Sequence, residues 1–178
     1  MRLFGRTPMP AVLRDQVKPR LGRGEHIAAW AAVRDGSAVA ATDAGLFHHD
    51  GSGFVLLPWA DVETATWRDG ALTVVEASSV FGSGRRHVFD LVDAHQLPEV
   101  VRTRVESTIA LSRHHRLPAA GRAGVRVVAR RQPHSITLRW MLVYDPGVNS
   151  TDPSVAEQAE ALLAQAKGSV AAAQADLI

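Results

Sequence analysis

One amphipathic stretch, LPEVVRTRVESTIALS from Leu97 to Ser112, constrains the fold most strongly because it follows a long series of short strand-like runs. Apolar residues recur in it at steps of three and four, which predicts a helix with one narrow apolar stripe. Pro98 suits the first helical turn, and Glu99 suits the positive end of the helix dipole. A single helix after many strands needs a sheet to cover, so we expect a domain of the α+β class.

The residues before this stretch alternate between β-prone runs and turn residues. Seven runs are predicted as strands, at residues 26–33, 38–42, 46–49, 54–59, 62–67, 71–77 and 86–92. Among the turns that separate them, the pair Asp69-Gly70 is the strongest signal for a tight hairpin. Seven short strands at this spacing indicate a small antiparallel barrel or sandwich.

Seven meandering strands followed by one amphipathic helix resemble the pleckstrin-homology-like fold, in which the helix plugs one open end of a strongly bent sheet. The resemblance covers about residues 25–115 and rests on this order and on pieces such as VAATDAGLF, LPWADVETATW and LPEVVRTRVESTIALSRH. These pieces look like bacterial, especially actinobacterial, members with the fold. The resemblance implies a seven-stranded antiparallel barrel capped by a helix. It implies no activity, because such folds host many unrelated functions.

We predict three parts: a basic N-terminal arm at 1–24, the pleckstrin-homology-like module at 25–116, and an extension at 117–178 packed on the module. The arm carries six arginines and lysines against one acid, Asp15. It is expected to be poorly ordered or to lie on the module surface, with a short helix around residues 11–18 as one interpretation.

The extension begins with a linker at 117–124, judged by its composition. Two strands at 125–131 and 136–144 follow and form a β-hairpin, and a C-terminal helix comes next. Asp152 is the expected N-cap of that helix, Pro153 its first residue and Gly168 its expected end. Because an isolated two-stranded hairpin is marginal in water, it should dock on the module or pack with this helix.

The composition argues against several kinds of chemistry. The chain has no cysteine, which excludes disulfides, thiolate metal sites and a cysteine nucleophile. The pairs His48-His49 and His114-His115 are poor chelators, because neighbouring residues point to different sides of a strand or helix. No G-x-S-x-G or H-E-x-x-H motif occurs, and the carboxylates around residues 61–76 fit the wet face of a hairpin. We therefore predict a protein that is not an enzyme and has no cofactor or metal site.

Charge and hydropathy indicate whether the chain is soluble and in which compartment it is expected. The net charge is +2 and the pI about 9.6, with arginine supplying nearly all the bases. No apolar run approaches the length that spans a bilayer, and the N-terminal residues lack an apolar segment long enough for a secretory signal. We expect a soluble, cytoplasmic protein, and the excess of Arg, Ala and Val is typical of a GC-rich bacterial genome.

Arginines supply the candidate contacts to a partner. The segment FGSGRR at 81–86 resembles an anion cradle, although it lacks the ending of a P-loop and also fits a flexible hairpin tip. In the extension, alternation places Arg126 and Arg130 on one strand face and Arg131 on the other. Trp140, among apolar neighbours, is expected in the core. The candidate anion or partner contacts are Arg85, Arg86, Arg126, Arg130 and Arg131.

These observations favour a non-enzymatic protein-binding adaptor or regulatory module, in which an extended peptide adds to a sheet edge or to the groove between sheet and helix. The alternative is a peripheral binder of anionic membrane lipid or nucleic acid, with membrane contact through the arm. The first hairpin turn, residues 34–37, lacks the several bases of lipid-binding members, which disfavours inositol lipids. Self-association through Val155, Leu162 and Leu163 is a further interpretation. Partner, pathway and oligomeric state stay open.

Overall fold

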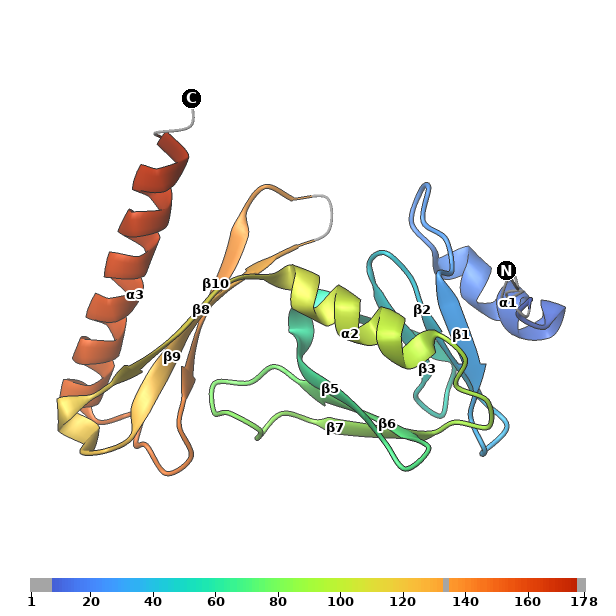
Figure 1. The fold of residues 1–178 in the computed structure, drawn as a ribbon, viewed down its shortest axis with the longest axis horizontal. Helices are drawn as coiled ribbons and strands as arrows, with labels where there is room; N and C mark the ends of the chain where they lie inside the picture. The colour runs from blue at the N-terminus through green and yellow to red at the C-terminus, as the bar shows by residue number, and fades with distance from the viewer. Residues whose placement is uncertain (1–7, 133–134, 176–178) are drawn as a thin grey trace, which may run out of the picture.

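The computed structural model describes residues 8–132 and 135–175, which form a mixed α+β fold with three antiparallel sheets (Figure 1). The first sheet contains β1 (Ala29–Ala32), β2 (Ala38–Ala41), β3 (Gly45–His49) and β4 (Phe54–Pro58). The second contains β5 (Val62–Arg68), β6 (Ala71–Glu76) and β7 (Arg86–Asp90). The third, in the order β10-β9-β8, contains β8 (Ile109–Arg116), β9 (Gly124–Arg131) and β10 (Leu138–Tyr144). The helices are α1 (Ala11–Val17), α2 (Leu97–Thr108) and α3 (Pro153–Ala175).

The seven strands predicted ahead of α2 are confirmed, each within three residues of its expected bounds. In the described residues these strands divide into two antiparallel sheets and form no closed barrel, so the antiparallel pairing is confirmed and the seven-stranded barrel is not. An isolated bridge between Val33 and Leu91 joins the two sheets at one corner. At the other corner Pro58, which has no N–H to donate, ends β4, and the short 3-10 helix Trp59–Asp61 turns the chain before β5 begins.

Helix α2 fills the space between these two sheets. Its stripe of Leu97, Val101 and Val105 is buried together with Trp59 of the 3-10 helix and with inward side chains of both sheets. Each fully buried side chain of this kind contributes about 1.5 to 3 kcal/mol. The prediction that the helix covers the strands is confirmed.

The end of that helix differs from the prediction. It was expected to run to Ser112, but it ends at Thr108, and the chain continues directly into β8 without a turn. Arg131 donates hydrogen bonds to the carbonyl oxygens of Ser107 and Ile109, at 3.3 and 3.2 Å, and so satisfies acceptors that a continuing helix would have used. Periodicity alone could not reveal this end, because residues 109–112 fit both patterns.

The predicted hairpin is confirmed as β9 and β10, although β10 begins at Leu138 and β8 adds a third strand. Helix α3 covers one face of this sheet (Figure 1), with a small core of Leu117, Val125, Tyr144, Val155 and Ala159. The segment predicted as a linker therefore contributes a fully buried residue, Leu117.

The structure decides three expectations about the C-terminal extension: the N-cap of α3, the end of α3 and the burial of Trp140. The N-cap prediction is confirmed, because the Asp152 carboxylate accepts the backbone N–H of Ser154 at 2.9 Å. The predicted end at Gly168 is wrong, since α3 continues to Ala175. Good helix formers around a single glycine outweigh its cost of about 1 kcal/mol. Trp140 is half-buried rather than part of the core.

The N-terminal arm is attached to the first sheet. Met9 and Val17 are buried and pack with Phe47, Phe54 and neighbouring alanines on the face of that sheet that points away from α2. The short helix expected around residues 11–18 is confirmed as α1. Residues 1–7 of the predicted arm lie outside the described part of the chain.

Candidate functional site

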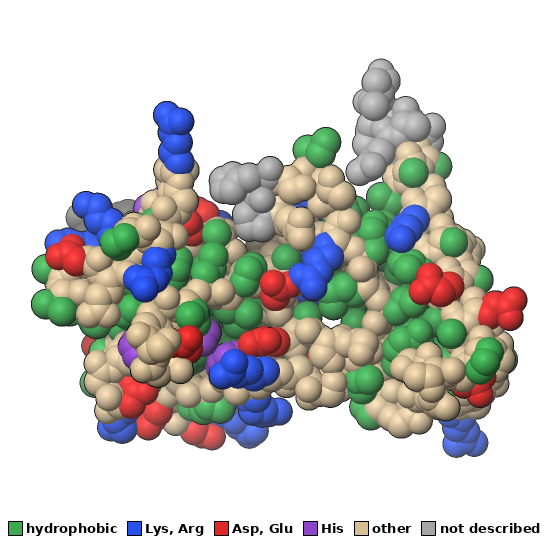
Figure 2. Space-filling view, turned by 180° about the vertical axis from the view of Figure 1, so that it is seen from behind, with side chains coloured by type: hydrophobic (Ala, Val, Ile, Leu, Met, Phe, Trp, Pro, Cys, Tyr) green, Lys and Arg blue, Asp and Glu red, His purple; other side chains and the backbone are tan. Residues whose placement is uncertain are grey.

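A cavity of about 190 Å³ lies where the second and third sheets meet. The space-filling view shows the molecule hollowed between these two parts (Figure 2). The walls of the cavity come from β5, the end of β6, the β6–β7 connection and one face of the third sheet. The lining residues are Glu63, Ala77, Phe81, Ile109, Ser112, Arg126, Val128, Arg130, Met141 and Val143.

The β6–β7 connection closes the cavity by extending the third sheet. Val80 forms a parallel bridge with Tyr144 at the end of β10. The N–H of Phe81 donates to the carbonyl of Tyr144 at 3.0 Å, and the N–H of Tyr144 donates to the carbonyl of Ser79 at 2.8 Å. The start of the segment FGSGRR is therefore held by β10, and its Phe81 side chain lines the cavity.

Arg130 is the most deeply buried charge at this site, with 4% of its surface exposed. One of its terminal nitrogens donates to Oγ1 of Thr108 at 2.7 Å, and the other donates to the backbone carbonyl of Glu63 at 3.3 Å. Its Nε is buried without a hydrogen-bond partner in the described residues. Burial lowers the pKa of Arg130, but an arginine stays protonated at neutral pH. The side chain thus fastens the end of α2 to β5 and keeps a positive charge at the cavity wall.

Glu63 is the one carboxylate among the lining residues. Both of its oxygens accept the backbone N–H of Gly82, at 3.0 and 3.2 Å. Burial raises the pKa of Glu63, while the Gly82 bond and the charge of Arg130 act in the opposite direction. Since Arg126 and Arg130 both line the cavity, positive charge exceeds negative charge in its wall.

The structure separates the predicted arginines into three groups. Arg126 and Arg130 share one face of β9, as expected, and line the same cavity. Arg131 is exposed at the strand end and holds the carbonyls at the C-terminus of α2. Arg85 and Arg86 are exposed near the start of β7 and are not among the lining residues.

Sequence reasoning missed Glu63 and the apolar lining residues. Glu63 was interpreted as part of a wet hairpin face, and no local pattern distinguishes it from the other acids nearby. Ile109 was assigned to a helix. Glu63 and the apolar residues line one cavity because the second and third sheets meet there. No sequence pattern predicts that the two sheets meet.

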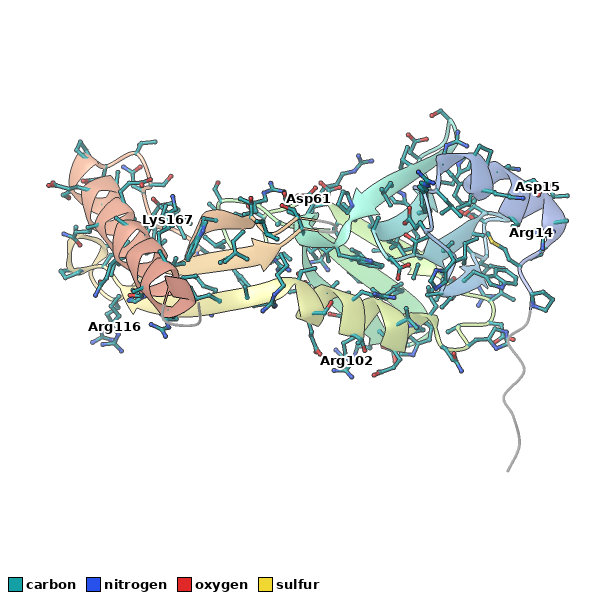
Figure 3. All side chains as sticks on the ribbon, turned by 90° about the horizontal axis from the view of Figure 1, so that it is seen from above. Arg14, Asp15, Asp61, Arg102, Arg116 and Lys167 are labelled. Carbon is teal, nitrogen blue, oxygen red and sulfur yellow. The ribbon has the colours of Figure 1, made fainter. Side chains whose placement is uncertain are left out.

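Beside the cavity, β8 is an open sheet edge. It pairs with β9 along one side, and no strand pairs with its other side in the described ranges. Arg113, His114 and Arg116 are exposed along it. Figure 3 shows Arg116 directed away from the body of the protein. His114 contacts the Asp145 carboxylate at 3.0 Å, and its hydrogen bond lowers the pKa of Asp145.

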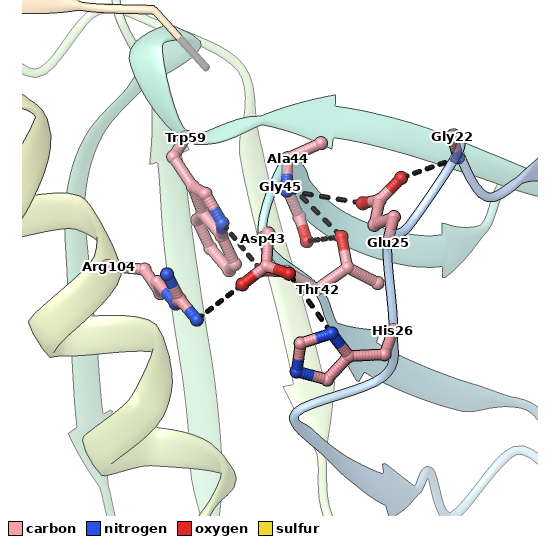
Figure 4. A network of polar contacts seen from close by, with 9 residues as sticks. All are labelled: Gly22, Glu25, His26, Thr42, Asp43, Ala44, Gly45, Trp59 and Arg104. Carbon is pink, nitrogen blue, oxygen red and sulfur yellow. Dashed lines mark hydrogen bonds and ion pairs between the residues drawn. The ribbon is translucent and has the colours of Figure 1, made fainter. Parts of the chain in front are cut away.

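A second polar cluster, around Asp43, fastens the fold (Figure 4). The Asp43 carboxylate contacts Arg104 of α2 at 2.6 Å and His26 at 3.3 Å. Glu25 accepts the N–H groups of Ala44 and Gly22 at 3.2 and 2.8 Å. Because protein donors already occupy both carboxylates, the cluster joins the arm, the β2–β3 turn and α2 and offers no free ligand.

Two histidines, His48 and His87, have neighbours in the fold that explain their positions. His48 is buried on β3 and its ring lies 4.7 Å, centroid to centroid, from that of His87 on β7. His87 in turn contacts Glu76, with 2.6 Å between Nε2 and Oε1. Burial lowers the pKa of His48, and the neighbouring His87 acts in the same direction. Across residues 8–132 and 135–175, no group of three or more potential ligands could hold a metal ion.

None of the helices in the described residues is both long enough and apolar enough to cross a membrane. Comparison with known proteins found no matching family model, no matching curated protein and no matching solved structure.

Proposed function

We propose that this chain is a non-enzymatic protein-binding adaptor or regulatory module whose contact surface is the third sheet. The observation that carries the proposal is the open edge of β8, eight residues long and without a paired strand in the described part of the chain. Its unpaired backbone groups are a template on which an extended peptide can add as a further strand.

We further propose that β1 to β7 and α2 form a pleckstrin-homology-like module. The order of four strands, three strands and one helix supports this assignment, as does the burial of the α2 stripe between the two sheets. In this proposal the module is the rigid support. It anchors β8 through the uninterrupted passage from α2 into that strand.

The alternative, a peripheral binder of anionic lipid or nucleic acid, has one supporting observation. Arg14, Lys18 and Arg23 are exposed in α1 and in the residues that follow it. Helix α1 lies at the end of the molecule opposite α3 (Figure 1). Cations near a membrane surface contribute about 1 kcal/mol each. We rank this alternative second because the β8 edge offers directional main-chain contacts and the arm does not.

An affinity capture from nuclease-treated lysate tests the proposal. The tagged full chain is washed at low and at high salt, and the bound material is identified by mass spectrometry. We expect one stoichiometric protein that survives the high-salt wash, since main-chain pairing and apolar contacts persist when charges are screened. Recovery of lipid or nucleic acid alone, all lost at high salt, would refute the proposal and support the alternative.

A further inference from the structure

We propose that the partner presents an extended, acidic segment that pairs with the free edge of β8 and inserts one apolar side chain into the adjoining cavity. This inference rests on the protein-binding function proposed above and names the chemistry of the partner. Three observations carry it: the register of β8, the apolar mouth of the cavity and the charge of the third sheet.

The register places the cavity within reach of an added strand. Ser112 lies opposite Val128 and His114 lies opposite Arg126, so these β8 residues share the sheet face that lines the cavity. A strand added to β8 would lie about 4.8 Å away, with every second side chain on that same face. One such side chain would therefore project over the cavity beside Ile109 and Ser112.

The mouth of the cavity exposes apolar side chains. Phe81 is 48% exposed and Ile109 is 37% exposed, and both line the cavity together with Met141. The volume of about 190 Å³ is below the range of about 300 to 1,000 Å³ typical of sites for drug-sized ligands. A single apolar side chain fits this combination of size and lining better than a cofactor does.

The charge of the third sheet selects an acidic partner. From residue 107 to residue 144 the sequence contains seven arginines and no aspartate or glutamate. Arg113 and Arg116 lie on the open edge, and Arg126 lies in the cavity wall. Three acids near this sheet are already engaged: Asp61 forms an ion pair with Arg139, Glu63 accepts a bond from Gly82, and Asp145 accepts bonds from His114 and Gly124.

The same charges disfavour other occupants. Antiparallel pairing of β8 with β8 of a second copy would bring the exposed arginines of the two edges together, and like charges on paired strands are destabilising. Nucleic acid would neutralise the arginines. However, its phosphates cannot pair with the alternating N–H and C=O groups of a strand edge, and they would leave the apolar cavity unfilled. An acidic polypeptide uses the edge, the cavity and the charge together.

Selection of short random peptides on the 178-residue chain tests this inference. We expect enriched sequences to carry acidic residues and to place an apolar residue among them at alternating positions. A synthetic peptide of the enriched sequence should then slow hydrogen exchange of the amides in residues 109–116.

Two variants and a matched control locate the contacts. Arg113→Glu combined with Arg116→Glu should weaken the selected peptide by about tenfold or more, and Phe81→Ala by about threefold or more. Arg14→Glu combined with Lys18→Glu makes the same change of net charge at the other end of the molecule (Figure 3) and should leave affinity within about twofold. All substituted side chains are exposed, so the fold should tolerate them.

Several results would overturn the inference. They are a library without enriched sequences, enrichment of basic peptides, unchanged affinity in the β8 variant, or no protection of residues 109–116. Tighter binding of a single-stranded DNA oligonucleotide, lost in the same variant, would assign the edge to nucleic acid instead. If affinity capture yields a salt-resistant protein that leaves β8 unprotected, this inference fails while protein binding stands.

Discussion

Two cores of this protein, the one around α2 and the one under α3, differ in what they leave exposed. The core around α2 is closed on both sides, because large side chains from two sheets meet the helix stripe. The core under α3 has fewer buried side chains and lies on one face of the third sheet, and the other face of that sheet lines a cavity. The first region has the features of a stable support and the second those of a contact surface.

The largest effect is expected in the first core. Trp59 is 2% exposed and its indole N–H donates to the carbonyl of Thr42 at 3.0 Å. Trp59→Ala should lower the free energy of unfolding by about 3 to 5 kcal/mol, through the cavity it leaves and the lost bond. Urea unfolding followed by circular dichroism measures this loss. A loss below about 1 kcal/mol would mean that the first core is not the support we describe.

A smaller effect is expected in the second core. Leu117 is fully buried between the third sheet and α3. Leu117→Ala should cost about 2 to 3 kcal/mol, at the lower end of such substitutions because a small core can collapse around the gap. Hydrogen exchange should accelerate in β9 and β10 while β2 and β3 stay protected. Equal acceleration in all three sheets would break the comparison, since the two cores would then unfold together.

A pH effect is expected in the first region. Burial holds the pKa of His48 below its ordinary value of 6.5, so the unfolded chain binds the proton first as the pH falls. The stability that neutral His48 provides is present above pH 6.5 and is lost as the pH drops toward its folded pKa. His48→Asn should flatten the decline of the urea midpoint in this window. The half-buried His115→Asn serves as the control in the third sheet, and an identical slope in both variants would contradict the assignment.

The smallest effect is expected in α3. Gly168 lies inside the helix, and a Cβ added there meets no atom within 4 Å. Gly168→Ala should stabilise the helix by about 0.5 to 1 kcal/mol and raise the melting temperature. An unchanged or lower melting temperature would show that the C-terminal half of α3 is not helical in solution, and the second region would then be smaller than described.

The sequence by itself determined the strands before α2, the start of that helix, the β9–β10 hairpin and the N-cap of α3. Each depends on neighbours within a few residues: alternation, an Asp-Gly turn, or a proline beside an aspartate. Even the shared face of Arg126 and Arg130 follows from alternation along one strand.

Only the tertiary structure decided where α2 ends and what the arginines contact. Residues 109–112 satisfy both a helical stripe and a strand, and pairing with β9 settles them as a strand. Arg130 reaches Thr108 and Glu63, which lie 22 and 67 residues away in the chain. The cavity likewise forms because the β6–β7 connection pairs with the end of β10. Contacts at such separations depend on how the sheets pack, and local periodicity carries no record of that packing.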